Sequence, residues 1–273
     1  MGRDRSNGAG WKRAAGVGLA VAAALCAPAA RAAHPLVTDD AGTLGQGVRQ
    51  VELTAALSRD AEGSGAERVS DHTGEGAAAI GYGLVDSLDL VVGLGTTWSR
   101  VRGQGGPTSE AKGVGDLALD LKWRAVERGG FALAVKPGVT LPTGDAGRGL
   151  GTGRPCWALT LIASQRIGPV ALHANVAYFR DDYARREDRE ASRLDRLHAS
   201  VAAAVQVASR LQVVADVGLE TSADQASSTG PAYALGGLVL AATDALELDV
   251  GVKAGLSAAE TDVAGLAGVT FRF

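Results

Sequence analysis

Histidine is the side chain best suited to acid–base or metal chemistry near neutral pH, and the chain contains four: His34, His72, His173 and His198. None lies in an HExxH motif, and no pair has the spacing of two ligands to one zinc ion. Cys156 stands alone after the N-terminal region, so it supports neither a metal site nor an intramolecular disulfide. The glycine-rich segment GRGLGTGRP (147–155) lacks the GK[ST] ending of a phosphate-binding loop. The sequence therefore predicts no metal or cofactor site.

Charged side chains recur with a period of two along most of the chain. In LELDVGVKAGL (246–256), Glu247, Asp249 and Lys253 alternate with leucines and valines. LQVVADVGLET (211–221) and GDLALDLKWR (115–124) repeat the pattern. Because successive side chains of a strand point to opposite faces, this period predicts strands with one apolar face and one polar face.

The connections between these segments are alternately short and long, and they divide the chain into twelve segments of about 10 residues, the length of a tilted membrane-crossing strand. Short periplasmic turns and longer extracellular loops are typical of outer-membrane barrels, in which the sheet must close because hydrocarbon tolerates no unpaired edge. We therefore predict an all-β protein, an antiparallel transmembrane β-barrel of twelve strands. A soluble β-sandwich, which also alternates, is the other interpretation. The strands are predicted to begin near Val48, Gly74, Leu88, Gly113, Phe131, Arg154, Val170, Leu194, Leu211, Pro231, Leu246 and Asp262.

Aromatic side chains on the apolar faces gather near the predicted strand ends, as expected of the girdles at the two membrane interfaces. Trp98, Trp157 and Tyr178 fall near long loops. A second group falls near short turns: Trp123, Phe131, Phe271 and Phe273.

Residues 1–32 resemble a secretory signal peptide. Basic residues precede the apolar run AAGVGLAVAAALCAPAA (14–30), and Ala30-Arg31-Ala32 fits a small-residue cleavage site. Cys26 would suggest a lipoprotein, but Leu25 precedes it where a small residue is expected. We assign residues 33–273 to the barrel and place the protein in the bacterial cell outer membrane. The net charge of −3 without a basic block gives no support for a nucleic-acid partner.

Four segments resemble the outer-membrane "MetA-pathway of phenol degradation" family, whose members are often labelled transporters: HPLVTDDAGTLGQG (34–47), GVGDLALDLKWR (113–124), PGVTLPTGD (137–145) and LHANVAY (172–178). The resemblance covers essentially the whole mature chain. It implies a barrel associated with the degradation of aromatic compounds, with a role in substrate uptake. The ending, with Phe273 last and Phe271 two before it, resembles the signal by which barrel assembly machinery recognises its clients.

The polar strand faces supply candidate lumen-lining residues. Twelve strands lie between eight-stranded barrels, which side chains fill, and sixteen-stranded porins, which are open. The charges either form a ladder that closes the lumen or set the selectivity of a narrow passage. The candidates are Glu52, Asp89, Asp116, Asp120, Lys122, Arg124, Lys136, Arg166, His173, Asp216, Glu220, Glu247, Asp249, Lys253, Asp262 and Arg272.

Two polar segments lie outside the predicted strands. DDYARREDREASR (181–193) falls where a long loop is due, so an external loop is favoured over a charged helix, and its arginines are candidates for contact with lipopolysaccharide phosphates. Asp39 and Asp40 precede the first strand. They lie either at or inside the periplasmic mouth or in a solvated leader, and the sequence does not choose between these places.

Three functions remain. The leading one is a passive outer-membrane channel for small molecules, aromatic ones among them, with outer-membrane lipids, lipopolysaccharide and the barrel assembly machinery as its other partners. The second is a closed structural barrel. The third is a lipid-modifying enzyme like the twelve-stranded outer-membrane phospholipase, which uses a histidine and a serine two residues apart with an asparagine as orienter. Here Asn175 stands where that serine is required, and the strand phase turns His173 into the lumen, so no catalytic residue is assigned.

Overall fold

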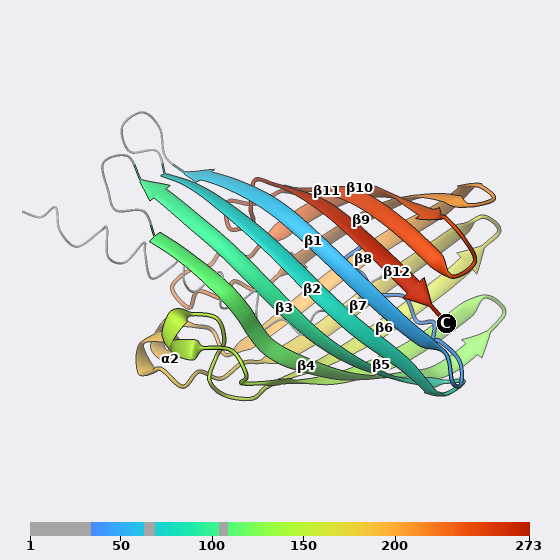
Figure 1. The fold of residues 1–273 in the computed structure, drawn as a ribbon, viewed down its shortest axis with the longest axis horizontal. Coiled ribbons are helices and arrows are strands. Elements are labelled where there is room, and N and C mark those ends of the chain that lie inside the picture. Colours follow the sequence, from blue (N-terminus) through green and yellow to red (C-terminus); the bar gives the residue numbers. More distant parts are fainter. Residues whose placement is uncertain (1–33, 63–68, 104–108) are drawn as a thin grey trace, which may run out of the picture.

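The structure is a computed structural model of the 273-residue chain, and it describes residues 34–62, 69–103 and 109–273. The predicted signal peptide, residues 1–32, lies outside the described residues. Twelve antiparallel strands form one closed barrel, in which each strand pairs with its sequence neighbours and the last pairs with the first (Figure 1). The predicted twelve-stranded antiparallel barrel is thus confirmed. The strands are β1 (Arg49–Glu62), β2 (Val69–Val85), β3 (Leu88–Gly103), β4 (Ser109–Arg128), β5 (Phe131–Leu141), β6 (Cys156–Ile167), β7 (Val170–Arg180), β8 (Asp195–Ala208), β9 (Leu211–Glu220), β10 (Ala232–Ala241), β11 (Leu246–Gly255) and β12 (Val263–Arg272).

Every predicted strand start lies within five residues of the observed start. The largest difference is in β2, which was expected to begin near Gly74 and begins at Val69. β2, β3 and β4 contain 17, 16 and 20 residues, more than a membrane crossing requires. Figure 1 shows these long strands running on past β10 and β11 at one end of the barrel.

The two ends of the barrel differ in their connections. We call the end with the short turns and the C-terminus the turn end, and the opposite end the loop end (Figure 1). The β4–β5 turn consists of Gly129 and Gly130, with φ of 60° and 80°. A two-residue hairpin turn needs positive φ at these positions to match the twist of its strands. At the same end, the N–H and C=O of Phe273 pair with Arg49, both at 2.9 Å, and close the barrel.

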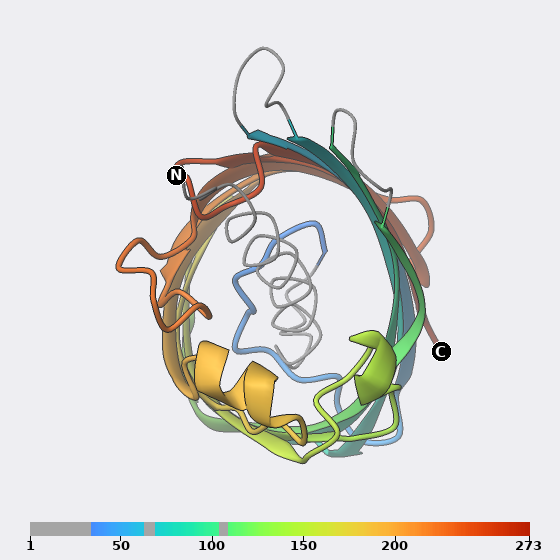
Figure 2. The ribbon, with the colours of Figure 1, turned by 90° about the vertical axis from the view of Figure 1, so that its left-hand side faces the viewer.

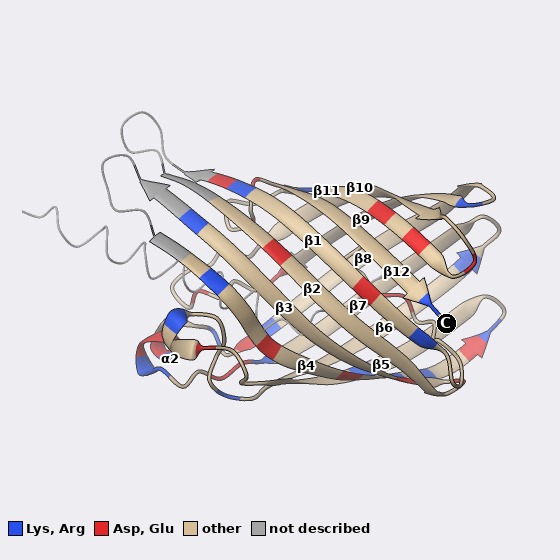
Figure 3. Cartoon of the chain, in the orientation of Figure 1, with Lys and Arg blue, Asp and Glu red and all other residues tan. Residues whose placement is uncertain are grey.

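The wall has the opposite polarity to that of a soluble protein. Large apolar side chains point outward and are exposed, among them Leu57 (73%), Trp157 (60%) and Val252 (58%). Charged side chains point inward and are buried, such as Asp120 and Lys136. Figure 3 shows the charges set singly along the strands and gathered in the loops near α2. A lipid-facing barrel requires this arrangement, whereas a soluble sandwich would bury the leucines.

The loops of the loop end are tied to one another. The loop at 142–155 carries a short 3₁₀ turn, η2 (Ala146–Arg148), and the loop at 181–194 carries α2 (Arg186–Ala191). The second loop was expected without a helix, and it contains this six-residue one. Ala184 N–H donates to the Thr152 carbonyl at 2.8 Å and so joins these two loops. Arg193 N–H donates to the Ala223 carbonyl at 2.8 Å and joins the second loop to the one after β9. Among the described residues, no helix is long and apolar enough to cross a membrane.

Candidate functional site

The segment at 34–47 lies inside the barrel, and we call it the plug. Figure 2 shows it within the ring of strands, where it crosses the lumen and returns to the wall before β1 begins. Its polar contacts reach the wall on opposite sides, at β3, β4 and β5 and at β8, β9 and β11. The site is therefore the lumen together with the chain segment that occupies it.

Asp39 makes the closest charged contacts of the plug. Its carboxylate accepts hydrogen bonds from the ammonium groups of Lys122 on β4, at 3.0 Å, and Lys136 on β5, at 2.6 Å. Asp39 belongs to the plug and not to a membrane-spanning strand. Its burial acts to raise the pKa of the carboxyl. The two ammonium groups outweigh that effect and hold the pKa below its ordinary value. Asp39 is therefore a carboxylate that pins the plug to one side of the wall.

A second carboxylate, Asp216 of β9, binds the plug from the other side. It accepts hydrogen bonds from the N–H groups of Val37 and Thr38, at 2.8 and 2.7 Å, and from the Thr38 hydroxyl at 2.8 Å. The same hydroxyl lies 2.8 Å from Ser200 Oγ on β8. Backbone N–H groups buried without partners would be costly, and Asp216 satisfies two of them at once.

The tip of the plug fits an apolar part of the wall. Leu36 packs in a buried cluster with Val214, Leu235 and neighbouring residues of β8, β9 and β10. Pro35 lies against Gly251 of β11, where an added Cβ would come within 2.8 Å of its ring. A glycine at this point of the wall leaves room for the proline. His34 Nδ1 contacts the Asp249 carboxylate on the same strand.

The base of the plug is held near the turn end. Leu44 N–H donates to Asp89 Oδ2 at 2.9 Å, and Gly47 N–H donates to the Gly83 carbonyl at 2.8 Å. A Cβ on Gly83 would stand 1.8 Å from the Gly45 carbonyl oxygen, so only glycine permits this approach. Gly45 itself has φ of 90°, a conformation that other residues rarely adopt.

Asp39 and Asp40 differ in their surroundings. Asp39 is inside the lumen and almost fully buried. Asp40 is more exposed, and its carboxylate lies 4.0 Å from Lys122 Nζ. The segment is therefore not a solvated leader, because its first aspartate is an internal tether.

His173 contacts a serine that the sequence pattern did not reveal. Ser164 of β6 pairs in register with His173 of β7, and its Oγ lies 2.8 Å from His173 Nδ1. The same Oγ accepts a hydrogen bond from Ala41 N–H at 2.8 Å. With its amide oriented to satisfy both contacts, Asn175 pairs with the backbone N–H and C=O of Asp39. Through Ala41 and Asp39, these residues of β6 and β7 hold the plug against the wall.

Five predicted lumen residues contact the plug directly: Asp89, Lys122, Lys136, Asp216 and Asp249. Four more predicted residues form ion pairs. Glu247 and Arg272 pair with each other, Glu220 pairs with Arg196, and Lys253 pairs with Glu260. Asp116 binds the loop at 142–155 through the N–H groups of Gly144 and Thr152, and Arg124 donates to the Asp86 carbonyl. Glu52, Asp120, Arg166 and His173 line lumen cavities, and Asp262 is exposed just before β12.

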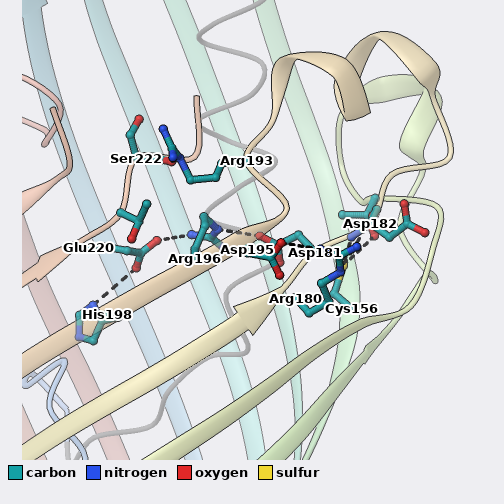
Figure 4. A network of polar contacts seen from close by, with 12 residues as sticks. Cys156, Arg180, Asp181, Asp182, Arg193, Asp195, Arg196, His198, Glu220 and Ser222 are labelled. Atoms are coloured by element: carbon teal, nitrogen blue, oxygen red, sulfur yellow. Dashed lines mark hydrogen bonds and ion pairs between the residues drawn. The ribbon is translucent and has the colours of Figure 1, made fainter. Parts of the chain in front are cut away.

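Arg196 was missed by the sequence reasoning. It lies on β8, buried, with its guanidinium 2.6 Å from Asp181 and in contact with Glu220 (Figure 4). Glu220 also contacts His198, so the contacts continue along β8 and β9. Arg196 and His198 share one face of β8, so the alternation itself was the signal that would have found the arginine.

Two cavities remain between the plug and the wall. One, of about 300 Å³, is lined by Asp89, Glu52 and Asp120 together with Lys122 and Lys136. The other, of about 500 Å³, lies toward the turn end and is lined by residues of the plug and of the wall from β4 to β12. Within the described ranges no cluster of three or more His, Cys, Asp or Glu residues is arranged to hold a metal ion.

The fold and the site define a class of protein: an outer-membrane type β-barrel with a charged lumen that its own N-terminal segment occupies. The model of the family described as "Putative MetA-pathway of phenol degradation" matches residues 38–273. The chain belongs to this family, as the four quoted segments indicated.

Solved structures share the barrel at low sequence identity. The translocator domain of the autotransporter NalP from Neisseria meningitidis aligns with a TM-score of 0.56 at 12% identity, over 96% of this chain and 98% of that one. The NanC porin aligns with a TM-score of 0.54 at 8% identity, over 81% and 98%. The KdgM porin aligns with a TM-score of 0.52 at 5% identity, over 82% and 99%. These likenesses support the outer-membrane fold, and no curated protein matches the chain.

Proposed function

We propose that the protein is a passive outer-membrane channel for small molecules, with its turn end in the periplasm and its loop end outside the cell. The observation that carries this proposal is the plug. The space inside the wall is occupied by a segment that hydrogen bonds and ion pairs hold, and such contacts are reversible. A wall of twelve strands encloses a wider lumen than that of an eight-stranded barrel, which side chains alone fill.

The plug has the features of a segment that can leave the lumen by rotating about a hinge. It leads into β1, which begins at Arg49, and two glycines with positive φ, Gly45 and Gly47, precede that junction. Hinges are short stretches that absorb large backbone changes, and glycine does so at little cost. We propose that solute passes when the segment before Gly45 leaves the wall.

Planar-bilayer conductance of the refolded mature chain tests this proposal. Wild-type protein should conduct rarely, and a variant lacking residues 34–44 should conduct steadily. A matched control keeps the plug in place. The Thr38 and Ser200 oxygens are 2.8 Å apart, so Thr38→Cys with Ser200→Cys should form a disulfide that silences the channel until a reductant is added.

Each alternative has its own outcome in this experiment. If neither the deletion variant nor the wild type conducts, the closed structural barrel is the correct function. If both conduct equally and the disulfide has no effect, the protein is a channel but the plug is not its closure.

The absence of enzymatic activity is part of the proposal. Ser164 and His173 resemble the start of a catalytic dyad, but the serine oxygen is engaged by Ala41 and both residues face the lumen. A lipid substrate would lie on the outer face. Phospholipase assays of the refolded protein should therefore give no activity, and Ser164→Ala should not change that result.

The remaining partners are proposed from the wall. Trp157 and Tyr178 are exposed near the loop end, where lipopolysaccharide would lie, and Trp98 lies beside Gly74 and the exposed Leu57 on the same outer face. Phe271 and Phe273 are exposed at the turn end. Aromatic rings favour such interfaces. We assign to the two phenylalanines the further role of recognition by the barrel assembly machinery.

A further inference from the structure

Lys122 of β4 and Lys136 of β5 lie opposite each other on neighbouring strands of the lumen wall. Each is one residue away from the registered pair Trp123–Val135, on the same side of it. Both side chains point into the lumen, and only 11% and 5% of their surfaces are exposed. Like charges directly opposite each other on a sheet repel, and burial strengthens the repulsion. This pair of lysines therefore requires an anion between its two ammonium groups.

In the docked plug that anion is the carboxylate of Asp39. It accepts hydrogen bonds from Lys122 Nζ at 3.0 Å and from Lys136 Nζ at 2.6 Å. Among the described residues, the wall itself supplies Lys136 with no carboxylate within 4.0 Å, so its ion pair is with the plug. When the plug leaves, the wall keeps two neighbouring ammonium groups whose shared carboxylate has gone. The same place can then be taken by the carboxylate of another molecule.

The lumen cavity of about 300 Å³ gives a solute access to this place. Both lysines and Asp39 line it, and Lys122 is the more exposed of the two lysines. One water molecule takes up about 30 Å³ of the liquid, so the cavity has room for a molecule of several heavy atoms. A small carboxylate in the cavity can therefore approach Lys122 while Asp39 is still bound.

Other carboxylates of the same cavity limit the charge of such a solute. Glu52, Asp89 and Asp120 also line it. Because like charges repel strongly where water is scarce, a solute with two or more negative charges would be opposed by these groups. A solute with a single negative charge brings only what Asp39 brings. The surroundings therefore favour a monocarboxylate over a polyanion.

We propose that Lys122 and Lys136 form a binding site for a small monocarboxylate solute, which Asp39 occupies in the docked plug and which the solute takes over when the plug leaves. Exchange of one carboxylate for another keeps both ammonium groups paired and avoids the cost of an unpaired buried charge. A ligand that binds the released state better shifts the equilibrium toward that state. The inference rests on the proposed channel function, because it makes the solute itself the ligand that opens the lumen.

Binding of fluoroacetate to the refolded mature chain in detergent tests the site, with ¹⁹F line broadening as the readout. Wild-type protein should bind weakly, because Asp39 competes with the probe. Asp39→Ala should bind roughly tenfold more tightly, because the probe then makes the charge-assisted hydrogen bonds. Adding Lys136→Met to Asp39→Ala should abolish this gain. Adding Lys253→Met instead should keep it, because that lysine pairs with Glu260 elsewhere in the lumen. Heat-modifiable gel mobility checks that each variant is folded.

Two analogues of the probe test the class of solute on Asp39→Ala. Fluoroacetamide has the same shape without the charge, and fluoromalonate has a second carboxylate. Each should bind several-fold more weakly than fluoroacetate. Binding of the amide as tight as that of fluoroacetate would overturn the carboxylate class, and tighter binding of fluoromalonate would overturn the single charge. Equal binding of fluoroacetate to the wild type and all three variants would overturn the site.

Single-channel recording separates the site from the channel. Fluoroacetate should raise the open probability of the wild-type protein saturably, and fluoroacetamide should not. An unchanged open probability, with saturable binding to Asp39→Ala, would overturn the exchange. Saturable binding with silent bilayers would remove the channel and keep the site. Steady conductance of Asp39→Ala without saturable binding would keep the channel and remove the site.

Discussion

Asp39 is the residue on which the position of the plug depends most. One carboxylate lies between the ammonium groups of Lys122 and Lys136, and its backbone pairs with Asn175. When one member of a buried ion pair is removed, the remaining charge has neither water nor a partner, which costs about 3–5 kcal/mol. Here two cations would be left facing each other, so the bound position of the plug would lose most of its advantage.

Asp39→Ala should therefore shift the plug toward its released state. A loss of about 3 kcal/mol corresponds to a change of roughly a hundredfold in the equilibrium, because each 1.4 kcal/mol is a factor of ten. Single-channel recording should show a large rise in open probability. Asp40→Ala is the matched control, because its carboxylate is 4.0 Å from Lys122 and more exposed, and its effect should be small. Equal behaviour of the two variants would show that Asp39 does not hold the plug.

Two strands of the wall have a glycine where the plug comes closest to them. Gly251 of β11 stands where Pro35 touches the wall, and Gly83 of β2 stands where the plug backbone passes. Gly251 is an inward position of the wall, and an added Cβ there would lie 2.8 Å from Pro35.

Gly251→Val should displace the tip of the plug without unfolding the barrel. The rate at which a maleimide labels a cysteine introduced at Val37 measures this displacement, since Val37 is held by Asp216 in the docked state. The rate should rise several-fold in Gly251→Val. Gly265→Val makes the same change on the outer face of β12, where an added Cβ meets nothing within 4 Å, and should leave the rate unchanged. An unchanged rate in both variants would contradict the fit of Pro35.

The strands could be predicted from the sequence because their signal is local. Period-two alternation in LELDVGVKAGL sets both faces of β11, and the start at Leu246 follows from the residues around it. The plug could not be predicted in this way. His34 reaches Asp249 across 215 residues of sequence, and Ser164 meets His173 through the β6–β7 register. Such contacts depend on closure of the whole barrel, which no local pattern encodes.

Phe273, the residue that follows β12, closes the barrel against the start of β1. Phe273 exchanges two backbone hydrogen bonds with Arg49, and its ring lies 5.4 Å from that of Phe271 on the outer face. Deleting Phe273, or changing both phenylalanines to serine, should leave export intact and block assembly. The protein should accumulate in the periplasm and lose the heat-modifiable gel mobility of folded barrels. Trp157→Ser, an exposed outer aromatic at the loop end, should assemble normally. Normal folding of the Phe273 deletion would remove its assembly role.

The whole molecule is asymmetric along its axis. The turn end has tight connections and the junction of the chain's last residue with β1, whereas the loop end has long connections that hydrogen-bond to one another. Insertions at the two ends therefore meet different constraints. In α2 the Glu187 side chain is 87% exposed, whereas Gly129 has the positive φ of a two-residue turn.

This asymmetry predicts the orientation of the barrel in the cell. An epitope inserted after Glu187 should be accepted and bound by antibody on intact cells, because the loop at 181–194 extends outside the membrane. The same epitope after Gly129 should be bound only after the outer membrane is permeabilised, and it should lower the yield because it opens a tight turn. An epitope after Phe273 should prevent assembly, since that residue closes the wall against Arg49. Labelling of the Gly129 insertion on intact cells, with a silent Glu187 insertion, would reverse the orientation and place the mouth that the plug enters on the outside.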